Sequence, residues 1–484
     1  MESVKLDEMI NFAKRKGFVF PSGELYGAFS GFWDFGPLGV ELKKNIKDAW
    51  WNFHVRQRED IVGIDGAIIT NPKIWESSGH VESFIDVAVI CKDCKTKAKI
   101  DRHEVDNAKC EKCGGELINK GEFNPMFTTQ VGPIVEDSIK AYLRPETAQL
   151  IFANFKNVLD TSRLKLPFGI AQQGKAYRNE IAPRNFLFRS REFEQMEIEY
   201  FIDPDKKESC PFINEVLDFE LKVYSASMQE NKESPEVMTI REALEKKIIN
   251  LPWHAYWLAT GLKWFEKQGA NLKNFRIRQH EKSELAHYSS DCWDLEYHFP
   301  FGWKELQGIA DRGVYDLQQH EKGSKKELRF FDEETKKKIL PMVVAEPSFG
   351  FERAFMVFMF DAYSKNEKGD VILKLSPRLA PVKVAILPLV KKDEKLVLIA
   401  KEIYNNLKKE WNIVYDQSGS VGRRYARNDE VGTPFCLTVD GESITNKDVT
   451  IRNRDDGSQK RIKISEVRSI LRDLISCEKK FSDI

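Results

Sequence analysis

The sequence lacks the features of membrane-spanning, exported, fibrous and disordered proteins. None of its apolar runs approaches the roughly 18 residues that cross a bilayer, and the longest, near Val382–Val390, has the length of a strand. Charged residues such as Lys5, Glu8 and Arg15 interrupt the segment Met1–Phe20, so we expect no secretory signal. Internal repeats and low-complexity tracts are absent. With 42% hydrophobic and 31% charged residues, the composition is that of a soluble, core-forming protein.

An excess of either charge is also lacking, since 75 Lys and Arg balance 75 Asp and Glu. A neutral chain is not expected to coat nucleic acid over its whole surface, although the balance does not exclude a local basic patch. The 484 residues suffice for two to four domains.

Cysteine is scarce, and half of the eight cysteines lie in two Cys-x-x-Cys pairs, Cys91/Cys94 and Cys110/Cys113. Without an export signal we expect a cytoplasmic protein with reduced thiols, so these four are interpreted as metal ligands; the alternatives are disulfides or a site that has lost its metal. Two such pairs supply the four tetrahedral thiolates that zinc prefers. Because the protein fills all four positions, we predict a structural zinc.

Periodicity divides the chain into a mixed N-terminal part and a C-terminal part in which strands and helices alternate. The stretch 376–381, with two prolines, is predicted to be the linker between them. Helices are predicted at 37–57, 212–230, 239–250, 253–268, 352–363, 395–410 and 465–474. Strands are predicted at 61–70, 164–172, 192–202, 275–280, 294–298, 342–345, 382–389, 413–415, 435–439 and 463–464.

Arginine and carboxylate residues gather in apolar surroundings in three segments, 143–149, 174–197 and 344–353. A single Arg–Glu pair is most often a surface ion pair. In the second segment, however, Glu192, Phe193 and Glu194 alternate, so a strand would turn one polar face toward a ligand that carries both charges. In the third, Arg353 stands where a strand passes into a helix, and free N–H groups beside a guanidinium suit phosphate.

Three motif-like segments carry a resemblance to a known family. They are the helix and strand that end at Pro72, the Tyr-Arg-Asn-Glu segment 177–180 with the strand around Phe193, and Gly-Phe-Glu-Arg at 350–353. These resemble motifs 1, 2 and 3 of class II aminoacyl-tRNA synthetases. Four further segments resemble the dimeric type of glycyl-tRNA synthetase: Ser78-Gly79-His80, Arg144-Pro145-Glu146-Thr147-Ala148-Gln149, Ala286-His287-Tyr288 and Glu346-Pro347-Ser348. The resemblance covers nearly the whole chain, and class I signatures are absent.

The resemblance implies a multidomain fold of the α+β and α/β classes. It has a class II antiparallel-sheet catalytic domain with a zinc-ribbon-like insertion and a helical insertion, plus a C-terminal α/β anticodon-binding domain. The implied boundaries are 1–88 (catalytic, with motif 1), 89–120 (zinc-binding insertion), 121–205 (catalytic, with motif 2), 206–274 (helical insertion), 275–376 (catalytic, with motif 3) and 377–484 (anticodon-binding).

The implied activity is that of a glycine–tRNA ligase, which makes glycyl-adenylate from glycine and ATP and transfers glycine to the 3' end of tRNA(Gly). This activity requires positive charge where two anions meet. By resemblance, the catalytic residues are Arg178, which bridges the glycine carboxylate and the α-phosphate, Glu180, which contacts adenine, and Arg353. Phe193 and Arg353 would stack on the two faces of adenine. The ATP site implied in this way comprises Arg178, Asn179, Glu180, Phe188, Arg189, Phe193, Glu305, Leu306, Gly350 and Arg353.

Magnesium with ATP and structural zinc are the implied cofactors, with Glu305 as the magnesium ligand. The implied glycine pocket binds the ammonium group with carboxylates and excludes larger amino acids by steric clash. Its residues are Glu146, Gln195, Glu197, Glu346 and Ser348. Family members usually carry Arg-Ala-Asp-His after the first cysteine pair. Here the stretch 99–103 differs, which leaves open whether Lys99 or Arg102 contacts the substrate.

The C-terminal segment 377–484 carries 21 basic and 16 acidic residues. Local positive charge attracts phosphates without fixing the sequence that is bound, and the alternative is a solvated face of mixed charge. The segment 418–425 resembles the anticodon-binding domain of this synthetase subgroup. Its basic residues form two clusters. One is Arg423, Arg424 and Arg427, and the other is Arg452, Arg454, Lys460, Arg461 and Lys463.

Apolar residues around motif 1 fit either a monomer core or the symmetric homodimer that we favour. The expected partners are ATP, glycine and tRNA(Gly), with no membrane. Two alternatives remain for function: a non-catalytic nucleic-acid-binding subunit that kept the fold, and a class II synthetase for another amino acid. Retention of the arginines that would bind phosphate argues against the first.

Overall fold

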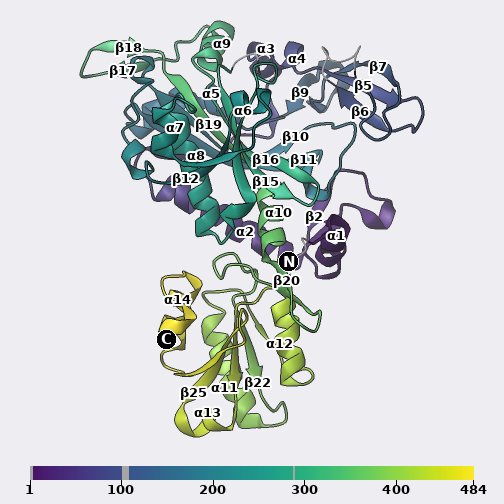
Figure 1. Cartoon of the computed structure of the whole chain (residues 1–484), viewed down its shortest axis with the longest axis vertical. Coiled ribbons are helices and arrows are strands. Elements are labelled where there is room, and N and C mark those ends of the chain that lie inside the picture. The colour runs from purple at the N-terminus through teal and green to yellow at the C-terminus, as the bar shows by residue number, and fades with distance from the viewer. Residues whose placement is uncertain (1–3, 101–107, 287–288) are drawn as a thin grey trace.

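The computed structural model describes residues 4–100, 108–286 and 289–484, so Arg102, His287 and Tyr288 lie outside the described residues. Figure 1 shows a large unit and a smaller unit, which is built from the C-terminal part of the chain. Among the described residues, no helix combines the length and apolarity that crossing a membrane would require.

The large unit is built on a nine-stranded sheet with the order β13-β12-β14-β15-β16-β19-β11-β10-β3. Its pairings are antiparallel except for β12 with β14 and β10 with β3. The strands are β3 (Ile61–Ile64), β10 (Phe168–Tyr177), β11 (Glu192–Ile202), β12 (Glu220–Tyr224), β13 (Glu236–Thr239), β14 (Phe275–Gln279), β15 (Cys292–Phe299), β16 (Gly302–Ala310) and β19 (Met342–Gly350).

One face of this sheet packs against a hydrophobic core and the other is polar. Along β11, Met196 and Ile198 point into the core, whereas Gln195 and Glu197 point to the opposite face, as the two-residue period of a strand requires. The helices of the core face are α2 (Pro37–Trp51), α8 (Pro252–Lys267) and α10 (Phe351–Ala362). Helix α5 (Ala148–Ser162) covers only part of the other face, where its Phe155 packs on Phe201.

The predicted strand 61–70 is two strands in different sheets. Beyond β3 the chain turns, and β4 (Ile69–Thr70) joins β9 (Ile139–Leu143) and β8 (Thr128–Val131) in a three-stranded sheet. Gly66 lies in this connection, where an added Cβ would lie 2.7 Å from the Leu150 side chain, so the close approach of α5 leaves room only for glycine.

The predicted helix 212–230 is wrong, and the segment 206–274 combines helices with two strands of the nine-stranded sheet. Strand β12 lies inside the predicted helix, and β12 and β13 extend the nine-stranded sheet. The cause is burial with a strand period, since Leu221 and Val223 enter the core while their neighbours do not. Of the predicted helix 212–230 only α6 (Ala226–Glu230) is helical, and of the predicted helix 239–250 only α7 (Ile240–Glu245).

A separate three-stranded sheet carries the cysteine pairs, with β5 (Asp86–Cys91) between β6 (Lys97–Ile100) and β7 (Leu117–Phe123). The remaining elements of the large unit are α1 (Leu6–Arg15), β1 (Val19–Pro21), β2 (Trp33–Phe35), α3 (Pro72–Ser77), α4 (His80–Ser83), α9 (Tyr315–Ser324), β17 (Phe330–Asp332), β18 (Lys337–Ile339), β20 (Tyr363–Lys365) and β21 (Val371–Leu373).

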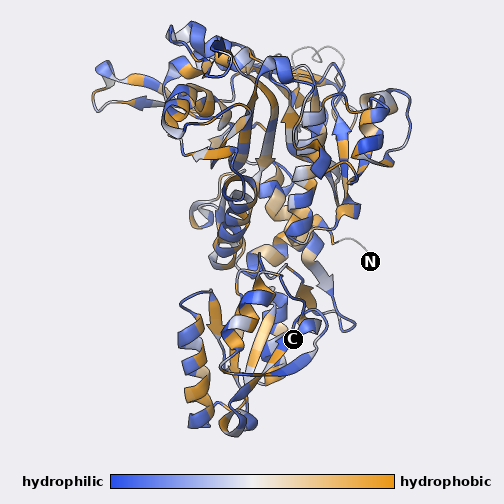
Figure 2. Cartoon of the chain, turned by 90° about the vertical axis from the view of Figure 1, so that its left-hand side faces the viewer, coloured by the Kyte–Doolittle hydropathy of each residue, from blue (hydrophilic) through white to orange (hydrophobic). Residues whose placement is uncertain are grey.

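The smaller unit is the predicted α/β domain, with a five-stranded sheet in the order β23-β22-β24-β25-β26. Figure 2 shows orange, hydrophobic strand segments in the middle of this unit, in keeping with β22 and β24, which are buried at every position. The strands are β22 (Val384–Pro388), β23 (Ile413–Tyr415), β24 (Phe435–Val439), β25 (Asp448–Asn453) and β26 (Gln459–Lys463), and the helices are α11 (Glu394–Leu407), α12 (Val421–Glu430), α13 (Gly441–Asn446) and α14 (Val467–Ile475).

The predicted linker, 376–381, is hydrogen-bonded to both units. On the large unit, Asn45 Nδ2 donates to the carbonyl oxygens of Leu379 and Ala380 at 3.1 and 3.0 Å. Arg378 donates through Nη1 to the Lys267 carbonyl at 2.9 Å and through Nε to the Ser476 carbonyl of the smaller unit at 2.8 Å. These bonds restrain the orientation of one unit relative to the other.

Candidate functional site

A cavity of about 520 Å³ lies on the polar face of the nine-stranded sheet. Its floor consists of alternate residues of neighbouring strands, and the register places them side by side. Ser348 of β19 is paired with Gly308 of β16, which is paired with Asp294 of β15. The two small residues at this level of the floor, Gly308 and Ala310, leave room above the middle strand.

The structure brings most of the predicted site residues together in this cavity. Those that line it are Glu146, Arg178, Glu180, Phe188, Arg189, Phe193, Gln195, Glu197, Glu305, Glu346, Ser348, Gly350 and Arg353. Two predicted residues do not line it. Leu306 is 1% exposed, and its side chain packs in the hydrophobic core on the other face of the sheet. Asn179 is exposed to solvent outside the cavity, and its N–H donates to the Pro125 carbonyl at 2.7 Å.

Arg178 stands where β10 ends, at the middle of the cavity wall. Its Nε donates to the Pro145 carbonyl at 2.9 Å, and its guanidinium carbon lies 5.4 Å from the ring centre of Phe193. These contacts fix the height of the guanidinium above the floor of the cavity. Its remaining donors are available to an anion, for which the planar guanidinium is well suited.

Two more arginines in the cavity are paired with carboxylates. Arg189 Nε lies 2.9 Å from Glu180 Oε2, and Arg353 Nη1 lies 3.1 Å from Glu305 Oε2. The Arg353 guanidinium also lies over the ring of Phe188, 4.5 Å from its centre. Partial desolvation opposes ionisation of Glu305, but the charge and hydrogen bond of Arg353, with the charges of His280 and Arg178, together outweigh it and lower the pKa of that carboxyl. We call Arg178, Arg189 and Arg353, with these paired carboxylates, the cationic half of the cavity.

The opposite end of the cavity is acidic. Its three carboxylates, Glu146, Glu197 and Glu346, come from the loop before α5 and from β11 and β19. The amide of Gln195 ties this end together, because its Nε2 donates to Ser348 Oγ at 3.3 Å and to Glu197 Oε1 at 3.4 Å. We call these five residues the acidic half of the cavity.

The three carboxylates of the acidic half differ in their affinity for protons. Burial raises the pKa of Glu346 to about 8, and the charges of Glu197 and Glu146 add to this shift. Burial also raises the pKa of Glu197. Burial opposes ionisation of Glu146 as well, but His80, Arg312 and Arg178 outweigh it and lower its pKa. At neutral pH the acidic half therefore holds a proton on Glu346 that a bound cation would displace.

A buried arginine that sequence reasoning missed supports this end of the cavity. Arg312 Nη1 donates to Glu346 Oε1 at 2.7 Å. The same guanidinium also makes two bonds to Asp316, at 2.8 and 2.9 Å, so its charge is shared, and burial still dominates the pKa of Glu346. Arg312 lies outside the motifs recognised in the sequence, so nothing in the sequence marked it as part of the site.

Lys99 also lines the cavity, where its Nζ lies 2.8 Å from Asp86 Oδ2. Its alternative in the sequence, Arg102, lies outside the described residues. Seven further polar residues of the lining were not predicted, namely Ser190, His280, Glu284, Ser289, Cys292, Asp294 and Glu352.

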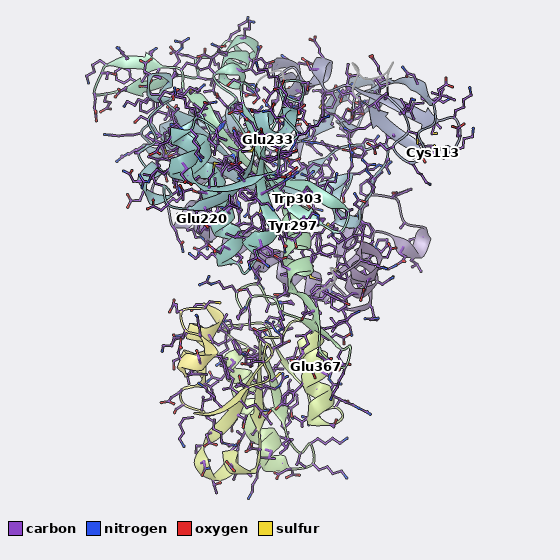
Figure 3. All side chains as sticks on the ribbon, viewed as in Figure 1. Cys113, Glu220, Glu233, Tyr297, Trp303 and Glu367 are labelled. Atoms are coloured by element: carbon purple, nitrogen blue, oxygen red, sulfur yellow. The ribbon has the colours of Figure 1, made fainter. Side chains whose placement is uncertain are left out.

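The four predicted zinc ligands converge, with their sulfur atoms all within 4.8 Å of one another. Cys91 Sγ lies 3.4 Å from Cys113 Sγ, and Cys94 Sγ lies 3.5 Å from Cys110 Sγ. Gly115 approaches the cluster so closely that an added Cβ would lie 3.1 Å from Cys91 Sγ. Four convergent thiols are the donor set that zinc prefers. Figure 3 shows Cys113 at the outer margin of the large unit, away from Tyr297 and Trp303 of the nine-stranded sheet.

The basic clusters predicted in the smaller unit are mostly bound within the chain. Arg424 and Arg454 are buried and donate to backbone carbonyls, and Arg454 Nη2 reaches the Leu375 carbonyl at 2.8 Å. Arg452 pairs with Asp429 at 2.8 Å. The mixed-charge alternative therefore describes much of this surface.

Comparisons with known proteins cover nearly the whole chain. A family model described as anticodon binding domain matches residues 383–474, within the smaller unit. A glycine–tRNA ligase of Borreliella burgdorferi (strain ZS7) is 44% identical over 478 residues, which cover 97% of each chain. Glycine–tRNA ligases of Thermobifida fusca and Acetivibrio thermocellus are each 41% identical over 497 residues, covering 97% and 96% of this chain and 98% and 97% of theirs.

Proposed function

Since the chain belongs to the glycine–tRNA ligase family, we propose that the cavity of the nine-stranded sheet is where glycine and ATP react. The protein is a ligase that charges tRNA(Gly) with glycine. The observation that supports this location is the coexistence of a cationic and an acidic half in one cavity. Glycine and ATP together carry both charges, and both reacting groups are anions.

In the first step, an oxygen of the glycine carboxylate attacks the α-phosphorus of ATP, and the bond from that phosphorus to the pyrophosphate oxygen breaks. Arg178 belongs to the cationic half but also acts electrostatically on Glu146 of the acidic half, and it would bridge the carboxylate and the α-phosphate. Its role is to neutralise the charge that accumulates as the two anions approach each other. Because Arg178 is already bonded to the Pro145 carbonyl, little reorganisation is needed when the substrates bind.

The cationic half would hold ATP. Adenine would stack on Phe193, with its amino group at Glu180 and Arg353 on its other face. Arg189 and Arg353 would bind the terminal phosphate and exchange their present carboxylate partners for phosphate oxygens. Glu305 would then be free to hold the magnesium ion that accompanies ATP.

The acidic half would hold glycine. The ammonium group would replace the proton on Glu346 and also meet Glu197 and the charge of Glu146, with Gln195 and Ser348 fixing the carboxylate positions. A larger amino acid would place its side chain against these tied groups. Rejecting a larger amino acid by steric clash is easier than rejecting a smaller one, because it does not depend on the small binding energy of a missing methylene group.

The remaining parts of the proposal concern metal, assembly and compartment. A structural zinc would be held by Cys91, Cys94, Cys110 and Cys113.

A homodimer is supported by three apolar side chains that a partner subunit would cover. They are Leu25, Tyr26 and Phe29, which are 86%, 89% and 78% exposed. ATP and tRNA as substrates support a cytoplasmic location.

The test is amino-acid-dependent exchange of pyrophosphate into ATP, measured with magnesium for each of the twenty amino acids. Exchange with glycine alone is expected. Exchange with a different amino acid would overturn the assignment of the acidic half while leaving ATP in the cationic half. No exchange by folded, zinc-containing protein would favour the alternative of a non-catalytic subunit.

A further inference from the structure

A second group of side chains that could bind a metal ion lies apart from the four-cysteine cluster. The ligand atoms of His280, Cys292 and Asp294 all lie within 4.8 Å of one another. His280 Nε2 and Asp294 Oδ2 are 2.8 Å apart. All three side chains line the cavity, and the proposed reaction uses none of them.

The fold brings these three residues together through strand pairing. Cys292 and Asp294 are two positions apart on β15, so their side chains point to the same, cavity-facing side of the sheet. His280 follows directly after β14, the neighbour of β15, and its N–H donates to the Cys292 carbonyl at 2.9 Å. A backbone bond therefore holds the histidine beside the thiol, independently of the side chains.

We propose that His280, Cys292 and Asp294 form a second metal site, which binds Zn²⁺ with its fourth coordination position open to the cavity. An imidazole nitrogen, a thiolate sulfur and a carboxylate oxygen are the three kinds of donor that zinc uses in proteins. The His280–Asp294 hydrogen bond is close to the required spacing. In a tetrahedral zinc site the two atoms would be about 3.3 Å apart, so the ion would replace the shared hydrogen after a small opening.

The surroundings of the three residues favour a cation with an accessible coordination position. Glu284 and Glu305 line the same cavity and act electrostatically on His280. Across the cavity floor, Gly308 contributes only hydrogen, and even an added Cβ there would lie 3.7 Å from Asp294 Oδ1. The fourth ligand would be water or an oxygen of the substrate that occupies the cavity.

The test is the zinc content of the purified full-length protein after exhaustive dialysis. Wild-type protein is expected to hold two zinc ions per chain. Cys292→Ser is expected to hold one, and Cys113→Ser, which breaks the four-cysteine cluster, is also expected to lose one. The matched control is Cys477→Ser, since Cys477 is an exposed thiol of the smaller unit and its replacement should leave two.

A wild-type content of one zinc that disappears in Cys113→Ser would overturn the proposal. So would a content of two that Cys292→Ser leaves unchanged. Asp294→Asn serves as a second variant in case Cys292→Ser does not fold, and it should lower the affinity for the second zinc at least tenfold. Zinc content does not depend on catalysis, so this result is independent of the pyrophosphate-exchange test.

Discussion

The two halves of the cavity are prepared for their ligands in different ways. In the cationic half, Arg353 and Glu305 form a pair whose side chains are 27% and 45% exposed, so a phosphate can displace the carboxylate at small cost. In the acidic half, Arg312 is 1% exposed and remains bound to Glu346 and Asp316. In the proposed function, ATP binding would therefore exchange the partners of a partly exposed ion pair. Glycine binding would exchange a proton for an ammonium group in a buried site.

Replacing the residue that joins the two halves should have the largest effect. Arg178→Ala is expected to lower the rate of glycine-dependent pyrophosphate exchange about 10²–10³-fold, because the charge of the approaching anions is no longer neutralised. The control is Arg184→Ala, since Arg184 is an exposed arginine of the same loop that pairs with Glu111 at 3.0 Å. An effect confined to the KM for ATP would contradict the bridging role.

The acidic half alone is tested by Glu346→Gln. We expect the KM for glycine to rise about 30- to 100-fold with little change in the KM for ATP, because a charge-assisted bond to the ammonium group is lost. Glu192→Gln is the matched control on β11, since Glu192 pairs with Lys175 and does not line the cavity. Equal changes in both KM values would show that the two halves are not separate.

The cationic half alone is tested by Arg353→Lys. Lysine keeps the charge but not the planar group that lies over Phe188. We therefore expect the KM for ATP to rise about tenfold at saturating glycine. The exposed Arg329, changed to lysine, serves as the control. An unchanged KM would mean that point charge, rather than guanidinium geometry, serves this half.

The smallest expected effect is a pH dependence that belongs to one half only. The pKa of Glu346 is raised to about 8, so its carboxyl is protonated below that pH and ionised above it. Because the ionised form binds the ammonium group, kcat/KM for glycine should rise about five- to tenfold between pH 7 and pH 8. The KM for ATP should stay level over this range. In Glu346→Gln the rise should be absent, and a rise that persists would assign it to another group.

Sequence reasoning located the strands of the cavity because their alternation is strong. Glu192–Ile202 is predicted and observed as one strand, and Gln195 and Glu197 share its polar face. The roles of the lining residues came from resemblance to a family, not from periodicity. The same alternation was overlooked at β12, where Leu221 and Val223 mark a strand within a region that otherwise favours helix.

The rest of the site could not be predicted, because it depends on contacts between distant segments. Arg312 meets Glu346 only through the pairing of β16 with β19. Leu306 stands next to the cavity residue Glu305 in sequence but points to the other face of the sheet. Charge counting in the smaller unit also failed to separate buried arginines such as Arg454 from exposed ones.

The hydrogen bonds that Asn45 and Arg378 make at the linker have a consequence for the choice of RNA. These bonds restrain the distance between the anticodon-binding domain and the cavity. An RNA that is bound by the smaller unit would reach the cavity with its 3' end under one condition. The distance from its bound segment to its 3' end must match the distance from the smaller unit to the cavity. With the cavity as the proposed reaction site, the linker would contribute a selection by length and shape that requires no contact with any base.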